Sequence, residues 1–204
     1  MIITEGEKTE PNYIIALRDH LRLKAADVEI IHPKGTDPMS LTEKAKALRE
    51  TRKKAAINGF LVEYDEVWVV FDLETANHPH RKKAEQVQSS KGFSGIDFAF
   101  SDPSFEYWLL LHEKYTTSNF PDSEAVEKRF KSFHADYSKG NWKPTKEFLI
   151  KLPSAVTRAE QCRQYHEESA GDGNPSTHVD KLARNLNEAA NPRHRIISLP
   201  ISET

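Results

Sequence analysis

A continuous apolar run in the first half of the chain places the strongest constraint on the fold. Residues Val67-Trp68-Val69-Val70-Phe71 include no polar position, so a strand formed there is buried on both faces. Strands of that kind belong to parallel sheets, because the helical connections between parallel strands cover both sides of the sheet. The run therefore predicts an α/β protein with an open parallel sheet flanked by helices.

The remaining sequence divides into an alternating part and a helical part. In the first part we expect strands at 1–4, 28–31, 67–71 and 96–100, with helices at 11–21, 37–48, 81–88 and 105–112. In the second part helical periodicity covers 123–133, 145–152, 155–168 and 177–190, a turn spans 171–175, and 196–200 is either an edge strand or an extension. The chain of 204 residues suits one domain with an appendage. We expect an α/β core at residues 1–115 and a helical extension at 116–204 packed on that core.

Composition excludes several classes of protein. The 29 basic and 31 acidic residues give a net charge of -2, which argues against a protein that coats nucleic acid without regard to sequence. The single cysteine, Cys162, rules out an intramolecular disulfide and a zinc finger. No apolar run has the length of a membrane span, and the first residues do not resemble a signal peptide. These features predict a cytoplasmic protein without a membrane partner.

Acidic residues follow two of the predicted strands. Glu5 ends the first strand and is followed by Gly6, while Asp72 and Glu74 follow the long apolar run. Residues two apart in an extended chain point the same way, so Asp72 and Glu74 would face one site, and Glu5 joins them if the two strands are neighbours. Three such carboxylates repel one another strongly unless a cation or protons intervene, and among cations their hard oxygen ligands favour Mg²⁺ or Mn²⁺. The alternative is that these are ordinary acidic residues where strands meet solvent.

Basic residues and one further glutamate are candidates for the same site. Lys8 lies three residues beyond Glu5, and Arg81 and Lys82 follow the second acidic segment, so we predict that these three cations bind phosphates of a nucleic acid. Glu106 interrupts an apolar helix. It is either a first-turn residue stabilised by the helix dipole or by an arginine, or a side chain beside the metal site. We interpret Glu7 and Glu10 as charges that complement a helix N-terminus.

Four segments, in this order, resemble the RloB-like family. They run from Ile2 to Tyr13, from Tyr64 to Asp72, from Phe100 to His112 and from Gly173 to Thr177, and the resemblance extends over residues 1 to about 190. It implies a Toprim-like fold in which Glu5 is a metal ligand or acid–base group and Asp72 and Glu74 are paired metal ligands. Glu74 stands where the family pattern has an aspartate, and the segment that follows it is longer than usual, which leaves no role assigned to His78.

The resemblance also implies a function. Family members resemble restriction-associated and phage-defence (abortive-infection) proteins that work with an ATPase partner, and this chain has no phosphate-binding loop of its own. The leading hypothesis is therefore a Mg²⁺-dependent nuclease that hydrolyses phosphodiester bonds of DNA or RNA. Glu5, Asp72 and Glu74 would be its catalytic metal centre. The rival hypothesis is a nucleic-acid-binding or regulatory subunit of a defence complex with little or no catalytic activity.

Overall fold

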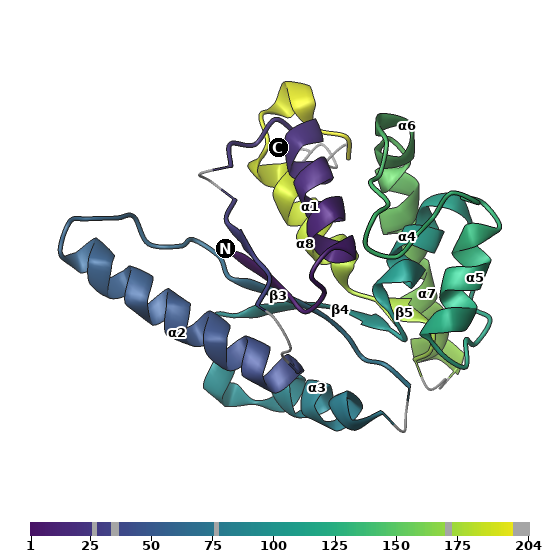
Figure 1. The fold of residues 1–204 in the computed structure, drawn as a ribbon, viewed down its shortest axis with the longest axis horizontal. Coiled ribbons are helices and arrows are strands. Elements are labelled where there is room, and N and C mark those ends of the chain that lie inside the picture. Colours follow the sequence, from purple (N-terminus) through teal and green to yellow (C-terminus); the bar gives the residue numbers. More distant parts are fainter. Residues whose placement is uncertain (26–27, 34–36, 76–77, 170–172, 198–204) are drawn as a thin grey trace.

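The computed structural model of the chain describes residues 1–25, 28–33, 37–75, 78–169 and 173–197. A five-stranded sheet runs through the centre, with helices on both of its faces (Figure 1). The strands are β1 (Ile2–Thr4), β2 (Ile30–Ile31), β3 (Trp68–Asp72), β4 (Asp97–Asp102) and β5 (Ser176–Thr177). The α-helices are α1 (Thr9–His20), α2 (Pro38–Ile57), α3 (Pro79–Ser89), α4 (Phe105–Glu113), α5 (Ser123–Lys131), α6 (Lys146–Leu149), α7 (Leu152–Ser169) and α8 (Val179–Ala189). Two short 3-10 helices span Lys91–Phe93 and Pro192–His194.

The sheet has the order β2-β1-β3-β4-β5, and its first four strands are parallel. Strand β1 pairs with β3 in the register Ile2 to Trp68 and Ile3 to Val69. Strand β5 is antiparallel to β4 at the edge. The predicted α/β fold with an open, mostly parallel sheet flanked by helices is therefore confirmed.

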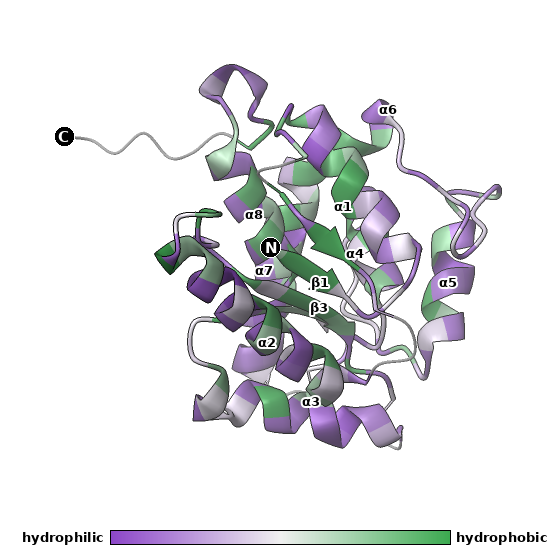
Figure 2. Cartoon of the chain, turned by 60° about the vertical axis from the view of Figure 1, so that its left-hand side comes forward, coloured by the Kyte–Doolittle hydropathy of each residue, from purple (hydrophilic) through white to green (hydrophobic). Residues whose placement is uncertain are grey.

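Side chains along the central strands alternate between two hydrophobic clusters. Ile3, Val69 and Phe71 face the cluster that α2 and α3 cover, while Trp68 and Val70 face the opposite cluster. This alternation is the period of two that a pleated strand imposes, and both faces are apolar because helices cover both. Figure 2 shows β1 and β3 in the hydrophobic colour inside a shell with polar helix faces.

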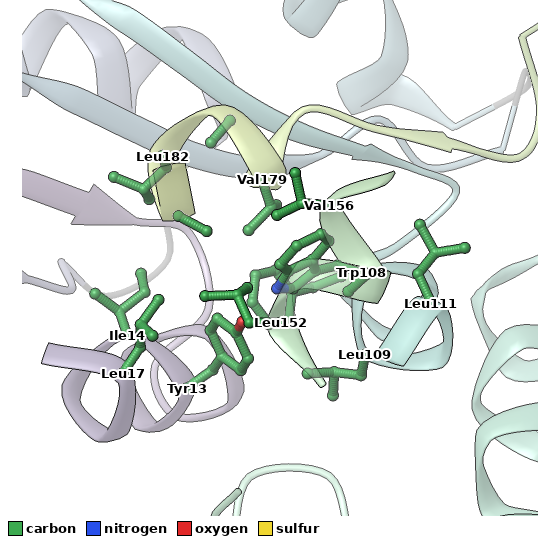
Figure 3. Packing of buried hydrophobic residues seen from close by; sticks show 14 of the residues in the cluster. Tyr13, Ile14, Leu17, Trp108, Leu109, Leu111, Leu152, Val156, Val179 and Leu182 are labelled. Carbon is green, nitrogen blue, oxygen red and sulfur yellow. The ribbon is translucent and has the colours of Figure 1, made fainter. Parts of the chain in front are cut away.

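The larger cluster lies between the sheet and helices α1, α4, α7 and α8. The fully buried Trp108 of α4 packs edge-on against Tyr13 of α1, and the same cluster includes Leu152 and Val156 of α7 and Leu182 of α8 (Figure 3). Residues on both sides of position 115 thus contribute to one core. The division into domains at residues 115 and 116 remains a prediction.

Local signals place the first helices as expected. Tyr13, Ile14 and Leu17 form the predicted apolar face of α1, Leu21 directly follows the helix, and all four are buried. Asp37 caps α2, because its carboxylate accepts hydrogen bonds from two backbone N–H groups in the first turn, and Pro38 occupies the first helical position.

The helix predicted at 177–190 begins later, because Ser176 and Thr177 instead form strand β5. The Thr177 hydroxyl is hydrogen-bonded to the Ser101 hydroxyl of β4 at 2.9 Å, and it accepts the N–H of Val179 in α8. Pairing with β4 therefore takes precedence over helix propensity, and it joins the third and fourth family-like segments. Of the predicted turn at 171–175, residues 171 and 172 lie outside the described residues.

Of the two alternatives for 196–200, an edge strand or an extension, the described part does not form a strand. Ile196 and Ile197 form a bend whose backbone N–H groups donate to the Asn187 side chain, while residues 198–200 lie outside the described residues. Within the described part of the chain, no helix is both long and apolar enough to span a membrane.

Candidate functional site

The chain leaves neighbouring strands β1 and β3 in opposite directions. Helix α1, which follows β1, packs on one face of the sheet, and α3, which follows β3, packs on the other. Such a divergence opens a crevice beyond the carboxyl ends of the two strands, which is where open α/β sheets bind ligands. A cavity of about 430 Å³ lies there, lined by the segment after β1, the segment after β3, and two residues of the loop after α5, Lys139 and Gly140.

Glu5 continues the hydrogen-bonding pattern of β1 into the crevice. Its N–H donates to the Val70 carbonyl at 2.9 Å, and its Oε2 accepts the Asp72 N–H at 3.1 Å. On the other side, its Oε1 lies 3.2 Å from Nδ1 of His80 in α3. Burial raises the pKa of Glu5 to about 7, in spite of the hydrogen bond from Asp72, and repulsion from Glu74 adds to the shift. The parallel register therefore brings Glu5 and Asp72 together, as expected for neighbouring strand ends.

Asp72 is the last residue of β3 and lies at the base of the crevice. Burial raises the pKa of its carboxyl well above the usual range, and the carboxylates of Glu10 and Glu106 add to the shift. Asp72 is thus surrounded by like charges contributed by α1 and α4. The electrostatics favour either a proton or an additional cation at this position.

Glu74 lines the crevice, but the reason given for its orientation is wrong. Strand β3 ends at Asp72, and Glu74 adopts a left-handed conformation with φ of 61°, so the two residues do not share one face of an extended strand. The Glu74 N–H donates to the Pro103 carbonyl at 3.0 Å, and its Oε2 accepts the hydroxyl of Ser123 at 3.2 Å. Non-glycine residues adopt this conformation at a cost, which their surroundings must offset.

The crevice offers carboxylate oxygens that could bind a metal ion, but fewer carboxylates lie together than the three that the sequence predicts. Among the residues that the structure describes, no three His, Cys, Asp or Glu side chains are grouped closely enough to bind one ion. The Glu74 carboxylate contacts Ser123, whereas Glu5 and Asp72 lie side by side on neighbouring strands. Two carboxylates are sufficient for Mg²⁺, which commonly completes its octahedron with water and phosphate oxygens. The donors therefore suit a two-carboxylate magnesium site.

The predicted phosphate-binding cations separate into two groups. Lys8 is exposed and lines the crevice. Arg81 points elsewhere, because its Nη1 pairs with Asp102 at 2.7 Å and it lines a second cavity of about 270 Å³. Lys82 is exposed on α3 and is not among the described residues that line the crevice. Of the three, only Lys8 reaches the position predicted for it.

Glu106 lies in the first turn of α4 and is 1% exposed. Its Oε1 accepts a hydrogen bond from the Tyr137 hydroxyl at 2.8 Å and lies 3.4 Å from Nζ of Lys139. Glu106 is a first-turn residue, as the first interpretation has it. Its negative charge also raises the pKa of Asp72 in the crevice, in line with the second. Its cationic partner is Lys139, not an arginine.

Glu10 lies in the first turn of α1, where its charge was expected to complement the helix N-terminus. Yet it is only 7% exposed and lines the crevice, and burial raises its pKa to about 7, with repulsion from Glu106 adding to the shift. Gly6 permits this arrangement, since a Cβ there would lie 2.0 Å from Oε2 of Glu10. The glycine after Glu5 is therefore the signal in the sequence for close packing at this point.

Two other residues of the site had no local signal. His80 follows Asp72 by eight positions, and Lys139 lies in a loop after α5 that only the tertiary structure brings to the crevice. A charge pattern along the chain does not reveal either contact, because each depends on how distant segments pack.

In a comparison with protein families, the family model described as RloB-like protein matches residues 1–186 of the chain. Comparison with curated proteins and comparison with solved structures give no match.

Proposed function

Because the chain belongs to the RloB-like family, we propose that it is a Toprim-type nuclease that hydrolyses phosphodiester bonds of DNA or RNA with Mg²⁺ or Mn²⁺. The observation that carries the proposal is that the carboxyl groups of Glu5, Glu10 and Asp72 line one crevice beyond the ends of β1 and β3. Burial raises the pKa of each of them. Perturbed carboxyl groups in a cleft are typical of functional sites, and a divalent cation would relieve their mutual repulsion.

The residues have distinct roles in this proposal. Glu5 and Asp72 would hold the metal, which when bound polarises a phosphoryl oxygen and activates water. His80 orients the Glu5 carboxylate through their 3.2 Å contact. Lys8 at the mouth of the crevice binds a phosphate next to the scissile one. Glu74, held by Ser123, borders the site without joining the two ligands.

The cellular setting is part of the same proposal. Family membership supports a role in phage defence, in which an ATPase partner controls the nuclease. The single cysteine supports a reducing compartment, the cytoplasm. Its thiol is buried and hydrogen-bonded to the Pro175 carbonyl at 2.9 Å.

One observation favours a second candidate, a nucleic-acid-binding or regulatory subunit without turnover. The third predicted ligand, Glu74, is bonded to Ser123 instead of facing the two other carboxylates. An acidic crevice that binds no divalent ion would fit such a subunit.

Metal titration and nucleic-acid cleavage together test the proposal. We expect calorimetric titration to detect Mn²⁺ binding by the full chain, and Asp72→Asn to weaken that binding by tenfold or more and to abolish cleavage of DNA or RNA. Asp97→Asn is the matched control, because Asp97 is exposed at the other end of the sheet, at the start of β4. Binding that Asp72→Asn leaves unchanged refutes the metal site, and binding without cleavage in the presence of the ATPase partner favours the regulatory subunit.

A further inference from the structure

The loop that follows α5 is hydrogen-bonded to α1 beside the crevice. Gly140 donates its N–H to the Thr9 hydroxyl at 3.2 Å, and Asn12 of α1 donates its side-chain amide to the Trp142 carbonyl at 3.2 Å. Gly140 has a positive φ of 84°, and a Cβ there would lie 3.0 Å from Cδ of Lys8. These contacts fix the backbone directly after Lys139 against the start of α1.

Lys139 lies partly in solvent and forms an ion pair with the buried carboxylate of Glu106. Its side chain is 55% exposed, whereas that of Glu106, 3.4 Å from Nζ, is 1% exposed. The second carboxylate oxygen of Glu106, Oε2, is buried and has no hydrogen-bond partner within the described part of the chain. A buried carboxylate with one unsatisfied oxygen is costly, so the ammonium group is an important compensation for it.

The influence of Lys139 extends beyond this single pair. Burial opposes its charge, yet attraction to Glu106, Asp72 and Glu10 raises the pKa of Lys139 above its ordinary value. Its own charge in turn acts to lower the pKa of Asp72 and of Glu10. Lys139, Asp72 and Glu10 also line the same cavity. The ammonium group therefore shares the carboxylates to which a divalent cation would be attracted.

We propose that Lys139 is a tethered cation that competes with the divalent metal for the acidic crevice. This inference rests on the proposed function, because it concerns the same site. Without metal, the ammonium group balances part of the negative charge of Asp72, Glu10 and Glu106. When a divalent ion binds beside Asp72, it repels the ammonium group and weakens its hold on Glu106. Metal binding is thereby coupled to the loop that carries Lys139.

The first test is calorimetric titration of the full chain with Mn²⁺ near pH 7.5. Lys139→Met removes a positive charge close to the ion, so we expect it to tighten Mn²⁺ binding by about tenfold. Lys139→Arg, which keeps the charge, should bind as the parent does. So should Lys143→Met, which removes an exposed charge from the same loop. Unchanged or weaker binding by Lys139→Met overturns the inference.

The outcomes separate this inference from the proposed function. If the parent binds Mn²⁺ and Asp72→Asn weakens that binding, but Lys139→Met binds no more tightly, then only the competition is refuted. If neither the parent nor Lys139→Met binds Mn²⁺, the metal function itself is refuted and the competition falls with it.

Thermal unfolding supplies a second readout that does not depend on activity. In EDTA, Lys139→Met should unfold at a lower temperature than Lys143→Met, because Glu106 loses its counter-charge. Saturating Mn²⁺ should raise the Tm of Lys139→Met by more than that of the parent, because the tighter complex stabilises the folded state more. An equal rise in the two proteins contradicts competition.

Discussion

Replacing Glu10 by glutamine should stabilise the protein in a pH-dependent way. The carboxyl of Glu10 is 7% exposed, and its pKa rises from 4.5 to about 7, first because of burial and then because of repulsion from Glu106. Below pH 4.5 the group is protonated in both the folded and the unfolded chain. Between pH 4.5 and 7 only the unfolded chain ionises, so this group makes the free energy of unfolding fall as the pH rises. Glutamine, which does not ionise, removes that loss.

The size of the effect follows from the pKa. Relative to the parent, Glu10→Gln should gain about 1 kcal/mol at pH 5 and about 3 kcal/mol at pH 8, since each pH unit between the two pKa values corresponds to about 1.4 kcal/mol. Urea denaturation in EDTA, followed by tryptophan fluorescence, measures this difference. The control is Glu43→Gln on the exposed side of α2, which should change stability by less than about 0.5 kcal/mol at either pH. A gain that is absent at pH 8, or equal at both pH values, refutes the electrostatic account.

Two further predictions concern the packing behind the site. Arg163→Met should lower the free energy of unfolding, measured by urea denaturation, by about 3–5 kcal/mol, because it removes both contacts of the ion pair with the 1%-exposed Asp180 carboxylate. Arg184→Met breaks an ion pair with a half-exposed glutamate and should lower it by less than about 1 kcal/mol. Equal costs would show that burial does not govern these pairs. Leu152→Ala should cost about 2–5 kcal/mol, because Leu152 is fully buried in the core between the sheet and α7, and a loss under 1 kcal/mol would contradict that packing.

The pattern of apolar residues along the chain predicts most of the strands and helices. A run such as 67–71 is apolar throughout only when both faces of a strand are covered, and a helical face such as that of α1 repeats every three or four residues. Both signals are local, and the structure has the expected strands and helices at these places. Strand β5 was not predicted, because its two residues form a strand only by pairing with β4, about 75 positions away.

The sequence by itself determined that Glu5 and Asp72 lie at the carboxyl ends of strands in a parallel sheet, and parallel strands bring these ends to the same edge. Only the tertiary structure decided the rest of the site. In the folded chain Glu10 lines the crevice, and so does Lys139 from a distant loop. Arg81 pairs with Asp102 and does not line the crevice. The physical reason is that hydrophobic periodicity fixes which face of an element is buried, whereas ion pairs and carboxylate clusters depend on distances between segments far apart in the chain.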